Sequence, residues 1–321
     1  GGVLAACWVQ GKAGTFGRFL TGGTDRCARE FDAKEGTAMR TLMWASDMQR
    51  RVVAGATTSM AIEQKAHHGA VTAVCASAME DRIFTASADR TVRAWDLRTG
   101  AAQQQYRGGS NALTSVCQSH KHLLVAGSLD RYAVAFHQVS TVVLHRYKPR
   151  EGGEPVYGVC TIDGSLFAAC GRDPRKPKSD NSSVARQYSL ETGRPIRDFA
   201  GHTEKLLACS SPGPHQLLTT SEDGTCRLWD VRSGAQARMF RGHVGPVLSA
   251  AASAEHNLVF TGGQDRVVRC WELGTGHPLA LLKTGSPVAA VCLAGRGDRV
   301  LAGLQDGMIR VWCSAGLSEK G

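Results

Sequence analysis

Six aspartates recur along the chain, with three of the intervals between neighbours 41 or 42 residues long, and carboxylates can serve as general acids, general bases or metal ligands. Asp89 and Asp130 are 41 residues apart, and Asp265 and Asp306 are also 41 residues apart. A catalytic or metal-binding set needs groups that converge on one place, whereas these carboxylates return once in each copy of a repeat. We therefore interpret them as residues of a repeated turn. The six are Asp25, Asp89, Asp130, Asp223, Asp265 and Asp306.

Eleven cysteines could supply nucleophiles, metal ligands or disulfides. No Cys-x-x-Cys pair occurs, which argues against a zinc ribbon. Five cysteines occupy the same place in five repeat units, where we expect neighbouring thiols to lie too far apart to pair: Cys7, Cys75, Cys117, Cys160 and Cys292. We interpret them as small buried apolar side chains, which predicts a reducing, intracellular compartment. The cytoplasm is the first expectation, and the nucleus and the cytoskeleton are the alternatives.

One arginine per unit also aligns on the third apolar run, and we interpret these side chains as stems that cover apolar surface rather than as an anion site. They are Arg29, Arg93, Arg186, Arg227, Arg269 and Arg310. No acid, base and nucleophile form a set that the repeat leaves unexplained. The sequence therefore predicts that the protein is not an enzyme. It predicts no catalytic residue, no cofactor, no metal site and no small-molecule substrate.

The elements that carry these residues follow from one repeated stretch. FTASADRTVRAWDLRTG at 84–100 returns at 218–234, 259–276 and 300–316, and a weaker copy lies at 19–36. Each unit holds four short runs, such as VTAVCAS, RIFTASA, TVRAWD and AAQQQY, with the composition of strands and no helical periodicity. A four-stranded sheet cannot bury both of its faces alone, but radial stacking of many sheets can. The sequence predicts an all-β propeller of four-stranded antiparallel blades.

Short motifs in these units carry a family resemblance. AWD at 94–96, LWD at 228–230, AGH at 200–202 and RGH at 241–243 resemble the signature of WD-repeat propellers. The resemblance implies that a loop His, a strand Ser, the turn Asp and the Trp form a hydrogen-bonded set in each blade. The matching residues are His67, Ser87, Asp89, Trp95, His202, Ser221, Asp223, Trp229, Asp265 and Trp271. Phe31, Phe136 and Tyr188 replace the Trp elsewhere, and Gly109 and Gly152 replace the His.

The number of blades depends on how one segment of the chain is counted. Residues 41–65 resemble a degraded unit with Thr58 in place of the turn Asp, and counting this unit gives eight. Asp25 and Thr58 are only 33 residues apart, so the alternative is an insertion in a ring of seven blades. The last unit ends soon after its third strand. We predict eight units, with seven as the alternative, in a single propeller domain over 1–321.

Charge and one insertion point to partners. The net charge is +10, which favours acidic partners such as protein surfaces or RNA. An insertion at 171–183 replaces one tight Asp turn and contains Arg172, Arg175, Lys176 and Lys178. The resemblance places this turn on the face that commonly binds partners, so we predict a partner-binding loop. The alternative is a solvated loop without a role.

Two functions remain open from the sequence. The resemblance implies a non-catalytic scaffold or adaptor, with other proteins of a larger complex docking on the loop face and the channel mouth. The alternative is an RNA- or ribosome-associated propeller that binds through its basic surface. Aromatic residues make up only 6% of the chain, which disfavours stacking on single-stranded bases. No apolar run approaches the length of a membrane-spanning helix, so we expect no membrane insertion.

Overall fold

The structure is a computed structural model that describes residues 1–9, 17–32, 38–42, 67–77, 81–119, 122–148, 154–171, 183–294, 297 and 299–313. Every regular element in these ranges is a β-strand. The second run of each unit, such as RIFTAS, is buried over nearly its whole length because it lies in the middle of a sheet that is covered on both faces. No helix in the described part is long and apolar enough to cross a bilayer.

The strands form seven antiparallel sheets, which we call blades one to seven. Blades one to three contain β1 (Val3–Val9), β2 (Arg18–Gly23), β3 (Ala28–Asp32), β4 (Ala38–Thr41), β5 (Val71–Ala76), β6 (Arg82–Ser87), β7 (Thr91–Asp96), β8 (Ala102–Arg107), β9 (Leu113–Ser119), β10 (Leu123–Ser128), β11 (Ala133–His137) and β12 (Val143–Tyr147). Blades four and five contain β13 (Val156–Ile162), β14 (Ser165–Cys170), β15 (Val184–Ser189), β16 (Pro195–Ala200), β17 (Leu206–Ser210), β18 (Gln216–Ser221), β19 (Thr225–Asp230) and β20 (Gln236–Arg241). Blades six and seven contain β21 (Val247–Ser253), β22 (Leu258–Gly263), β23 (Val267–Glu272), β24 (Pro278–Lys283), β25 (Val288–Ala294), β26 (Arg299–Leu304) and β27 (Ile309–Cys313).

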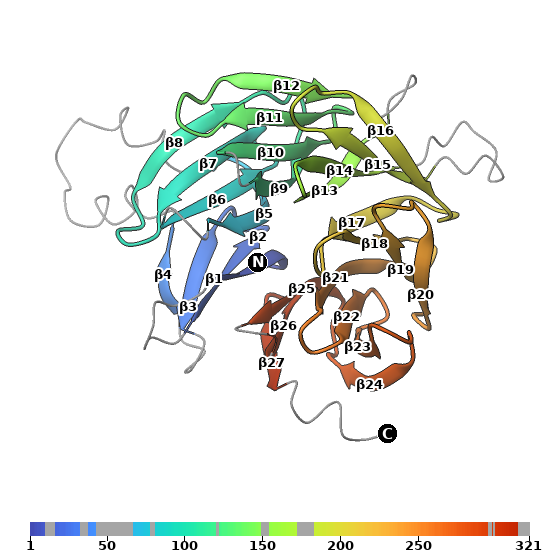
Figure 1. The fold of residues 1–321 in the computed structure, drawn as a ribbon. Helices are drawn as coiled ribbons and strands as arrows, with labels where there is room; N and C mark the ends of the chain where they lie inside the picture. The colour runs from blue at the N-terminus through green and yellow to red at the C-terminus, as the bar shows by residue number, and fades with distance from the viewer. Residues whose placement is uncertain are drawn as a thin grey trace, which may run out of the picture.

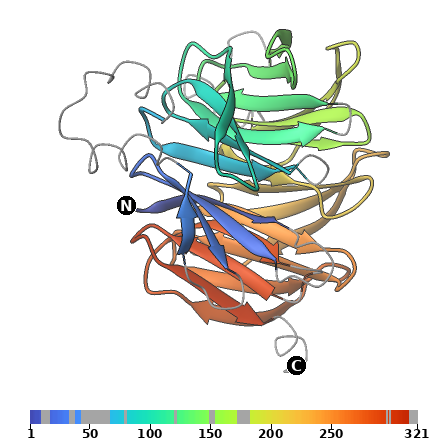
Figure 2. The ribbon, with the colours of Figure 1, turned by 90° about the vertical axis from the view of Figure 1, so that its left-hand side faces the viewer.

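The blades stand around a central axis, with the first strand of each blade innermost and β12, β16, β20 and β24 at the periphery (Figure 1). Successive inner strands contact one another from β1 through β5, β9, β13, β17 and β21 to β25. The ring closes because β25 also contacts β1. Figure 2 shows the first blade, in blue, between the second blade in cyan and the seventh in red.

The prediction of eight units is therefore wrong, and the alternative of seven blades is confirmed. The first blade has its own fourth strand, β4, and its inner strand contacts β5 of the next blade directly. This contact leaves no place in the ring for another blade between them. Residues 43–66, which include Thr58, connect β4 to β5 and lie outside the described residues.

Close contact between neighbouring blades depends on a small residue near the end of the second strand. A Cβ atom on Gly22 would collide with the Val71 side chain of blade two. At the closure of the ring, a Cβ atom on Gly303 would collide with Val3 of blade one in the same way. Both valines are buried, so each glycine makes room for an apolar side chain of the next inner strand.

Blade seven differs from the other six. Its described part has three strands, and β27 forms its outer edge. The side chains of Met308 and Val311 beside and within this strand are exposed. The expectation that the last unit ends after its third strand agrees with this arrangement, and residues 314–321 lie outside the described part.

Candidate functional site

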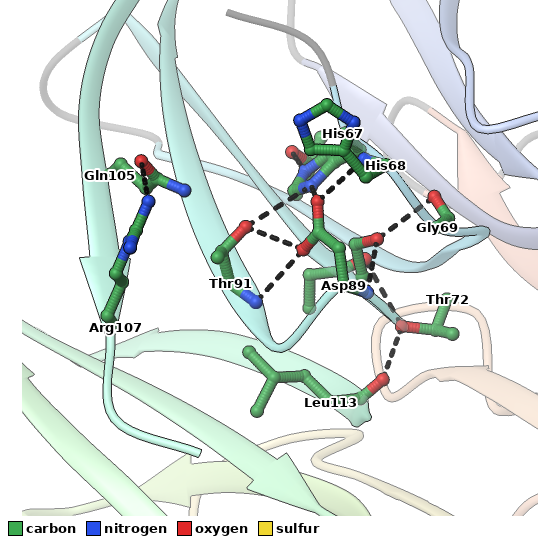
Figure 3. Close-up of polar contacts among 12 residues, drawn as sticks. His67, His68, Gly69, Thr72, Asp89, Thr91, Gln105, Arg107 and Leu113 are labelled. Atoms are coloured by element: carbon green, nitrogen blue, oxygen red, sulfur yellow. Dashed lines mark hydrogen bonds and ion pairs between the residues drawn. The ribbon is translucent and has the colours of Figure 1, made fainter. Parts of the chain in front are cut away.

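A chain of side-chain hydrogen bonds crosses the interior of blade two. His67 Nδ1 lies 2.7 Å from Asp89 Oδ2, and His67 Nε2 lies 2.8 Å from Thr85 Oγ1. Trp95 Nε1 donates to the same Thr85 hydroxyl at 2.8 Å. His67, Thr85 and Trp95 are all buried, so each of their polar atoms needs a partner within the protein. Figure 3 shows His67 above the carboxylate of Asp89.

The order of donors and acceptors along these hydrogen bonds requires the imidazole of His67 to be neutral. Trp95 can only donate, so Thr85 accepts from it and donates its own proton to His67 Nε2. His67 Nδ1–H then donates to the Asp89 carboxylate. Burial lowers the pKa of His67, and this effect exceeds the opposing hydrogen bond to Asp89. The imidazole is therefore an uncharged structural link rather than an acid–base catalyst.

The turn carboxylate is fully occupied. Burial raises the pKa of Asp89, but its hydrogen bonds outweigh burial and hold the pKa well below the usual range. One oxygen accepts from His67 and from the His68 backbone N–H at 2.9 Å. The other accepts from the Thr91 backbone N–H at 3.0 Å and from its hydroxyl at 2.6 Å. Asp89 closes the turn between β6 and β7 and has little capacity left for a ligand.

Sequence reasoning placed Ser87 in this set and missed Thr85. The structure places Ser87 in the turn, where its hydroxyl donates to the Gly69 carbonyl and accepts from the Asp89 backbone N–H. The link between His and Trp is the threonine, which lies four residues before the turn Asp and ten before the Trp. That spacing was readable in the sequence.

Blades five and six repeat the arrangement. Thr219 joins His202 to Trp229, and Thr261 joins His243 to Trp271, with all four distances between 2.7 and 2.9 Å. Ser221 again donates to a backbone carbonyl and accepts from the Asp223 N–H. In blade six the position of this serine is Gly263, and the other four side chains still form the chain through Asp265. His243 was therefore the missing partner of the predicted pair Asp265 and Trp271.

Blades without the Trp use other contacts. Phe31 stacks on Phe19 with ring centroids 4.9 Å apart. Phe136 packs at an angle against Tyr106, and the Tyr188 hydroxyl donates to the Lys148 carbonyl at 2.9 Å. Gly152 lies outside the described residues. These blades rely on ring packing and single hydrogen bonds where blades two, five and six have a continuous chain of hydrogen bonds.

The comparisons with known proteins agree with this geometry. The family model described as "WD domain, G-beta repeat" matches residues 60–96, 193–230 and 234–272, which include the three Trp residues of the complete hydrogen-bond chains. The chain is a WD-repeat β-propeller. This family generally consists of non-catalytic scaffolds for protein interactions.

Individual relatives are more distant. WD repeat-containing protein 37 of Mus musculus is 26% identical over 258 residues, which cover 68% of this propeller and 51% of that protein. The protein of the same name from Xenopus tropicalis is 30% identical over 122 residues, 37% of this chain and 24% of that one. WD repeat-containing protein pop1 of Schizosaccharomyces pombe is 25% identical over 165 residues, 46% of this chain and 19% of that one. The propeller spans about half the length, or less, of the curated relatives it matches.

The turns that carry the Asp residues lie on one face of the propeller, which we call the Asp-turn face. Thr72 at the start of β5 donates to the carbonyl of Leu113 at the start of β9, and Thr114 donates to Val156 at the start of β13. Neighbouring blades therefore run in the same sense, and equivalent turns emerge on the same side. The threonine contact between blades two and three is drawn in Figure 3.

A strained arginine follows the turn Asp in four blades. The residue after the Asp has a positive φ in six described turns, and it is glycine in two of them, Gly224 and Gly307. The other four are Arg26, Arg90, Arg131 and Arg266, with φ between 64° and 77°. All four arginine residues are exposed, so each presents a guanidinium group on the Asp-turn face. Three of them stand on the adjacent blades one, two and three, and we call this sector the basic arc.

Two hollows lie within the basic arc. One, of about 590 Å³, is lined by Arg90, Arg93 and Arg107 together with His68, Asp89, Thr91 and Gln105. The other, of about 570 Å³, is lined by Asp130, Arg131, Tyr132 and Lys148. In the described part of the chain, no group of three or more His, Cys, Asp or Glu residues could hold a metal ion.

The predicted basic loop emerges from the same face. Gly171 follows β14 and Ser183 precedes β15, so the insertion occupies the Asp-turn position of blade four. Arg172, Arg175, Lys176 and Lys178 lie outside the described residues. Their proposed contact with a partner therefore stays a prediction.

The aligned arginines of the third strands are not only apolar stems. Arg29 pairs with Asp25, Arg186 forms two hydrogen bonds with Asp198, and Arg227 donates to Gln236. In blade two the residue directly across the sheet from Arg93 is Gln105, which accepts from Arg107 at 3.4 Å. The aligned arginine of blade two thus faces the hollow with a second arginine beside it.

One of the five aligned cysteines, Cys160, lies close to Cys209 of the next blade, which occupies a different position in its own unit. Cys209 Sγ donates across the blade boundary to the Phe167 carbonyl at 3.7 Å, and Phe167 is the strand partner of Cys160. A hydrogen bond with Cys209, together with burial, raises the pKa of the Cys160 thiol. The inner strands converge toward the axis, which brings these positions together. All eleven cysteines are free thiols, and Cys313 alone is exposed.

Proposed function

We propose that this propeller is a non-catalytic interaction scaffold that docks an acidic protein partner on the Asp-turn face, centred on the basic arc. The observation that carries the proposal is the recurrence of arginine at a left-handed position of the turn. A residue with a side chain at such a position costs about 1–2 kcal/mol relative to an ordinary conformation. Gly224 and Gly307 occupy the equivalent positions, so the turn itself does not require arginine.

Backbone strain that recurs with one residue type supports a role for that side chain. Arg90 is exposed and makes no side-chain hydrogen bond or ion pair within the part of the chain that the structure describes, so it is available to a partner. The turn carboxylates beneath these arginines are occupied by their own turns, as Asp89 illustrates. An acidic surface would gain charge-assisted hydrogen bonds to several guanidinium groups at once.

The basic insertion at 171–183 and the net charge of +10 support the same class of partner. Electrostatic attraction of this kind raises the rate of association and falls with salt. Docking at the channel mouth and membership of a larger complex belong to the same proposal. An intracellular, reducing compartment stays a prediction from the cysteine content.

The test compares two variants with the same change of charge on opposite faces. The first carries Arg26→Gln, Arg90→Gln and Arg131→Gln in the basic arc. The second carries Arg98→Gln, Arg194→Gln and Arg232→Gln, which lie in turns between third and fourth strands. Affinity capture with mass spectrometry, with and without nuclease, identifies the proteins that each variant retains. A reciprocal capture with each identified protein then checks the pair.

We expect the first variant to lose its partners and the second to retain them, regardless of nuclease. Retention of all partners by both variants would show that the Asp-turn face is not the docking surface. Loss of partners on nuclease treatment alone would favour the RNA-associated alternative.

A further inference from the structure

Two thiols face each other across the boundary between blades four and five. At each boundary that carries an aligned cysteine, this fifth residue of one inner strand shares an apolar cluster with the fourth residue of the next inner strand. Four boundaries combine one thiol with an aliphatic side chain: Cys7 with Val74, Cys75 with Val116, Cys117 with Val159, and Cys292 with Ala6. Between β13 and β17, which are neighbouring inner strands (Figure 1), the pair is Cys160 and Cys209.

The close approach of these two strands depends on Gly158, the third residue of β13. A Cβ atom at this position would lie 2.9 Å from the backbone nitrogen of Cys209 and 3.0 Å from the Cα atom of Ala208. The equivalent residue of the other six inner strands is alanine or serine: Ala5, Ala73, Ser115, Ala208, Ser249 and Ala290. The backbone of β17 therefore occupies space that a side chain on β13 would need.

Hydrogen bonds hold the two sulfur atoms at this boundary. Cys209 Sγ donates to the Phe167 carbonyl at 3.7 Å, and Phe167 pairs with Cys160 in the sheet of blade four. A hydrogen bond with Cys209 raises the pKa of the Cys160 thiol, and burial raises it further. Cys160 is buried, whereas Cys209 is half-buried, so Cys209 is the more accessible of the two thiols.

From this arrangement we propose that Cys160 and Cys209 form a reversible disulfide when the protein meets hydrogen peroxide. Peroxide oxidises the more accessible Cys209 thiol to a sulfenic acid, and one molecule of water is released. The sulfur of Cys160 then attacks the sulfenic sulfur, and the S–S bond forms. The hydroxyl group leaves with the proton of Cys160 as a second molecule of water. Two molecules of a small thiol reverse the reaction, because they reduce the bridge and become a disulfide themselves.

The bridge joins the inner strands of two blades and encloses β14, β15 and β16 in a covalent loop. In the reducing compartment predicted from the sequence the pair stays reduced, so the bridge records exposure to an oxidant. At the other four boundaries a valine or an alanine takes the place of the second thiol, so the aligned cysteines there have no such partner.

The experiment exposes the whole chain to hydrogen peroxide, quenches it in acid and alkylates the remaining thiols in denaturant. Mass spectrometry with and without reductant then maps the linked peptides. Cys209→Val is the first test variant, because valine faces the aligned cysteine at three other boundaries. Gly158→Ala is the second, because its Cβ atom meets the β17 backbone. Cys117→Ser is the matched control, since it removes an aligned thiol that faces Val159. Thermal unfolding verifies that all variants remain folded.

We expect a peptide pair that joins Cys160 to Cys209 in the parent chain and in the control, and that disappears with reductant. Cys209→Val should abolish the pair and leave Cys160 as a free thiol, and Gly158→Ala should form the bridge more slowly than the parent chain. Sulfinic acid at Cys209 beside an unmodified Cys160, or disulfides spread equally over other cysteines, would overturn the proposal. A lower thermal midpoint in the oxidised chain than in the reduced chain would also overturn it, because the fold would then have to distort to form the bridge.

Discussion

At the scale of single residues, the stability of the complete blades depends on a threonine hydroxyl that has two roles. Thr85 accepts from Trp95 and donates to His67, so it joins the sheet interior to the loop before the blade. The aspartate and tryptophan could be predicted from their repeat, but threonine is common in strands and its role was overlooked. Its fixed spacing from Asp and Trp in three blades is the signal that identifies it.

Thr85→Val removes the hydroxyl without changing the volume of the side chain. We expect it to lower the free energy of unfolding by about 2–4 kcal/mol, because it leaves two buried polar atoms of His67 and Trp95 without partners. Urea denaturation measures this change. The matched control is Thr21→Val, at the equivalent buried position of blade one, where Phe31 replaces the Trp. An equally small loss for both variants would contradict the role of Thr85.

The neutral histidines predict how stability depends on pH. Burial lowers the pKa of His67, His202 and His243 from the ordinary value of 6.5. The unfolded chain therefore binds more protons than the folded chain below about pH 6.5, and stability falls as the pH is lowered through this range. The folded carboxylates Asp89 and Asp223 have lowered pKa values, so their contribution is lost only as the pH falls below about 3.8.

Urea midpoints at pH 7.5, 6.5 and 5.5 test the histidine contribution. We expect a progressive decrease, and a smaller slope in His202→Gln, which removes one of the three titrating groups. A midpoint that stays constant over this range would show that the imidazoles are not held neutral by the fold.

At the scale of elements, the short runs of each unit were correctly predicted as strands, four in each of six blades and three in the described part of the seventh. The turns between them were predicted only in part. Asp-Arg and Asp-Gly pairs are visible in the sequence, but the positive φ of the second residue follows from the closed geometry of the turn. Arginine and glycine adopt the same backbone conformation at this position. This left-handed conformation costs free energy for arginine but not for glycine. That difference separates the turns that could present a charge from those that could not.

Arg90→Gly should relieve the strain of its turn. We expect the free energy of unfolding to rise by about 0.5–1 kcal/mol, because the relief of backbone strain exceeds the entropy that glycine adds to the unfolded chain. The reverse exchange, Gly224→Arg in blade five, should lower stability by a similar amount because φ is 78° at this position. Thermal unfolding of the two variants beside the parent chain measures both changes. Destabilisation by Arg90→Gly would mean that the arginine side chain supports the fold.

At the scale of the whole molecule, the repeat predicted the architecture but not the number of blades. The segment 41–65 has the composition of a unit, and its spacing was compatible with either count. The number is decided by contacts between residues far apart in sequence, namely those of β1 with β5 and with β25. The sequence carries only a weak signal of such contacts, for example the small residue Gly303 opposite Val3.

The contact that closes the ring between blades seven and one can be tested by enlarging the side chain on one side of it and shortening the side chain on the other. Gly303→Val should cost about 1–3 kcal/mol, because its side chain would overlap Val3. Adding Val3→Ala to this variant should recover part of the loss, whereas Val3→Ala alone should destabilise the ring by leaving a cavity. Urea denaturation of the four proteins gives the coupling energy. Strictly additive effects would contradict a direct contact between the two residues.

The burial of the thiols has a practical consequence for measurement. Ten of the eleven cysteines are buried or half-buried, and Cys313 at the end of β27 is exposed. A maleimide fluorophore should therefore attach to one defined position of the unaltered chain. That position lies on the edge of the three-stranded seventh blade, where the backbone has no neighbouring strand in the described part. A single dye there turns the open edge of the ring into a reporter of any strand or protein that comes to cover it.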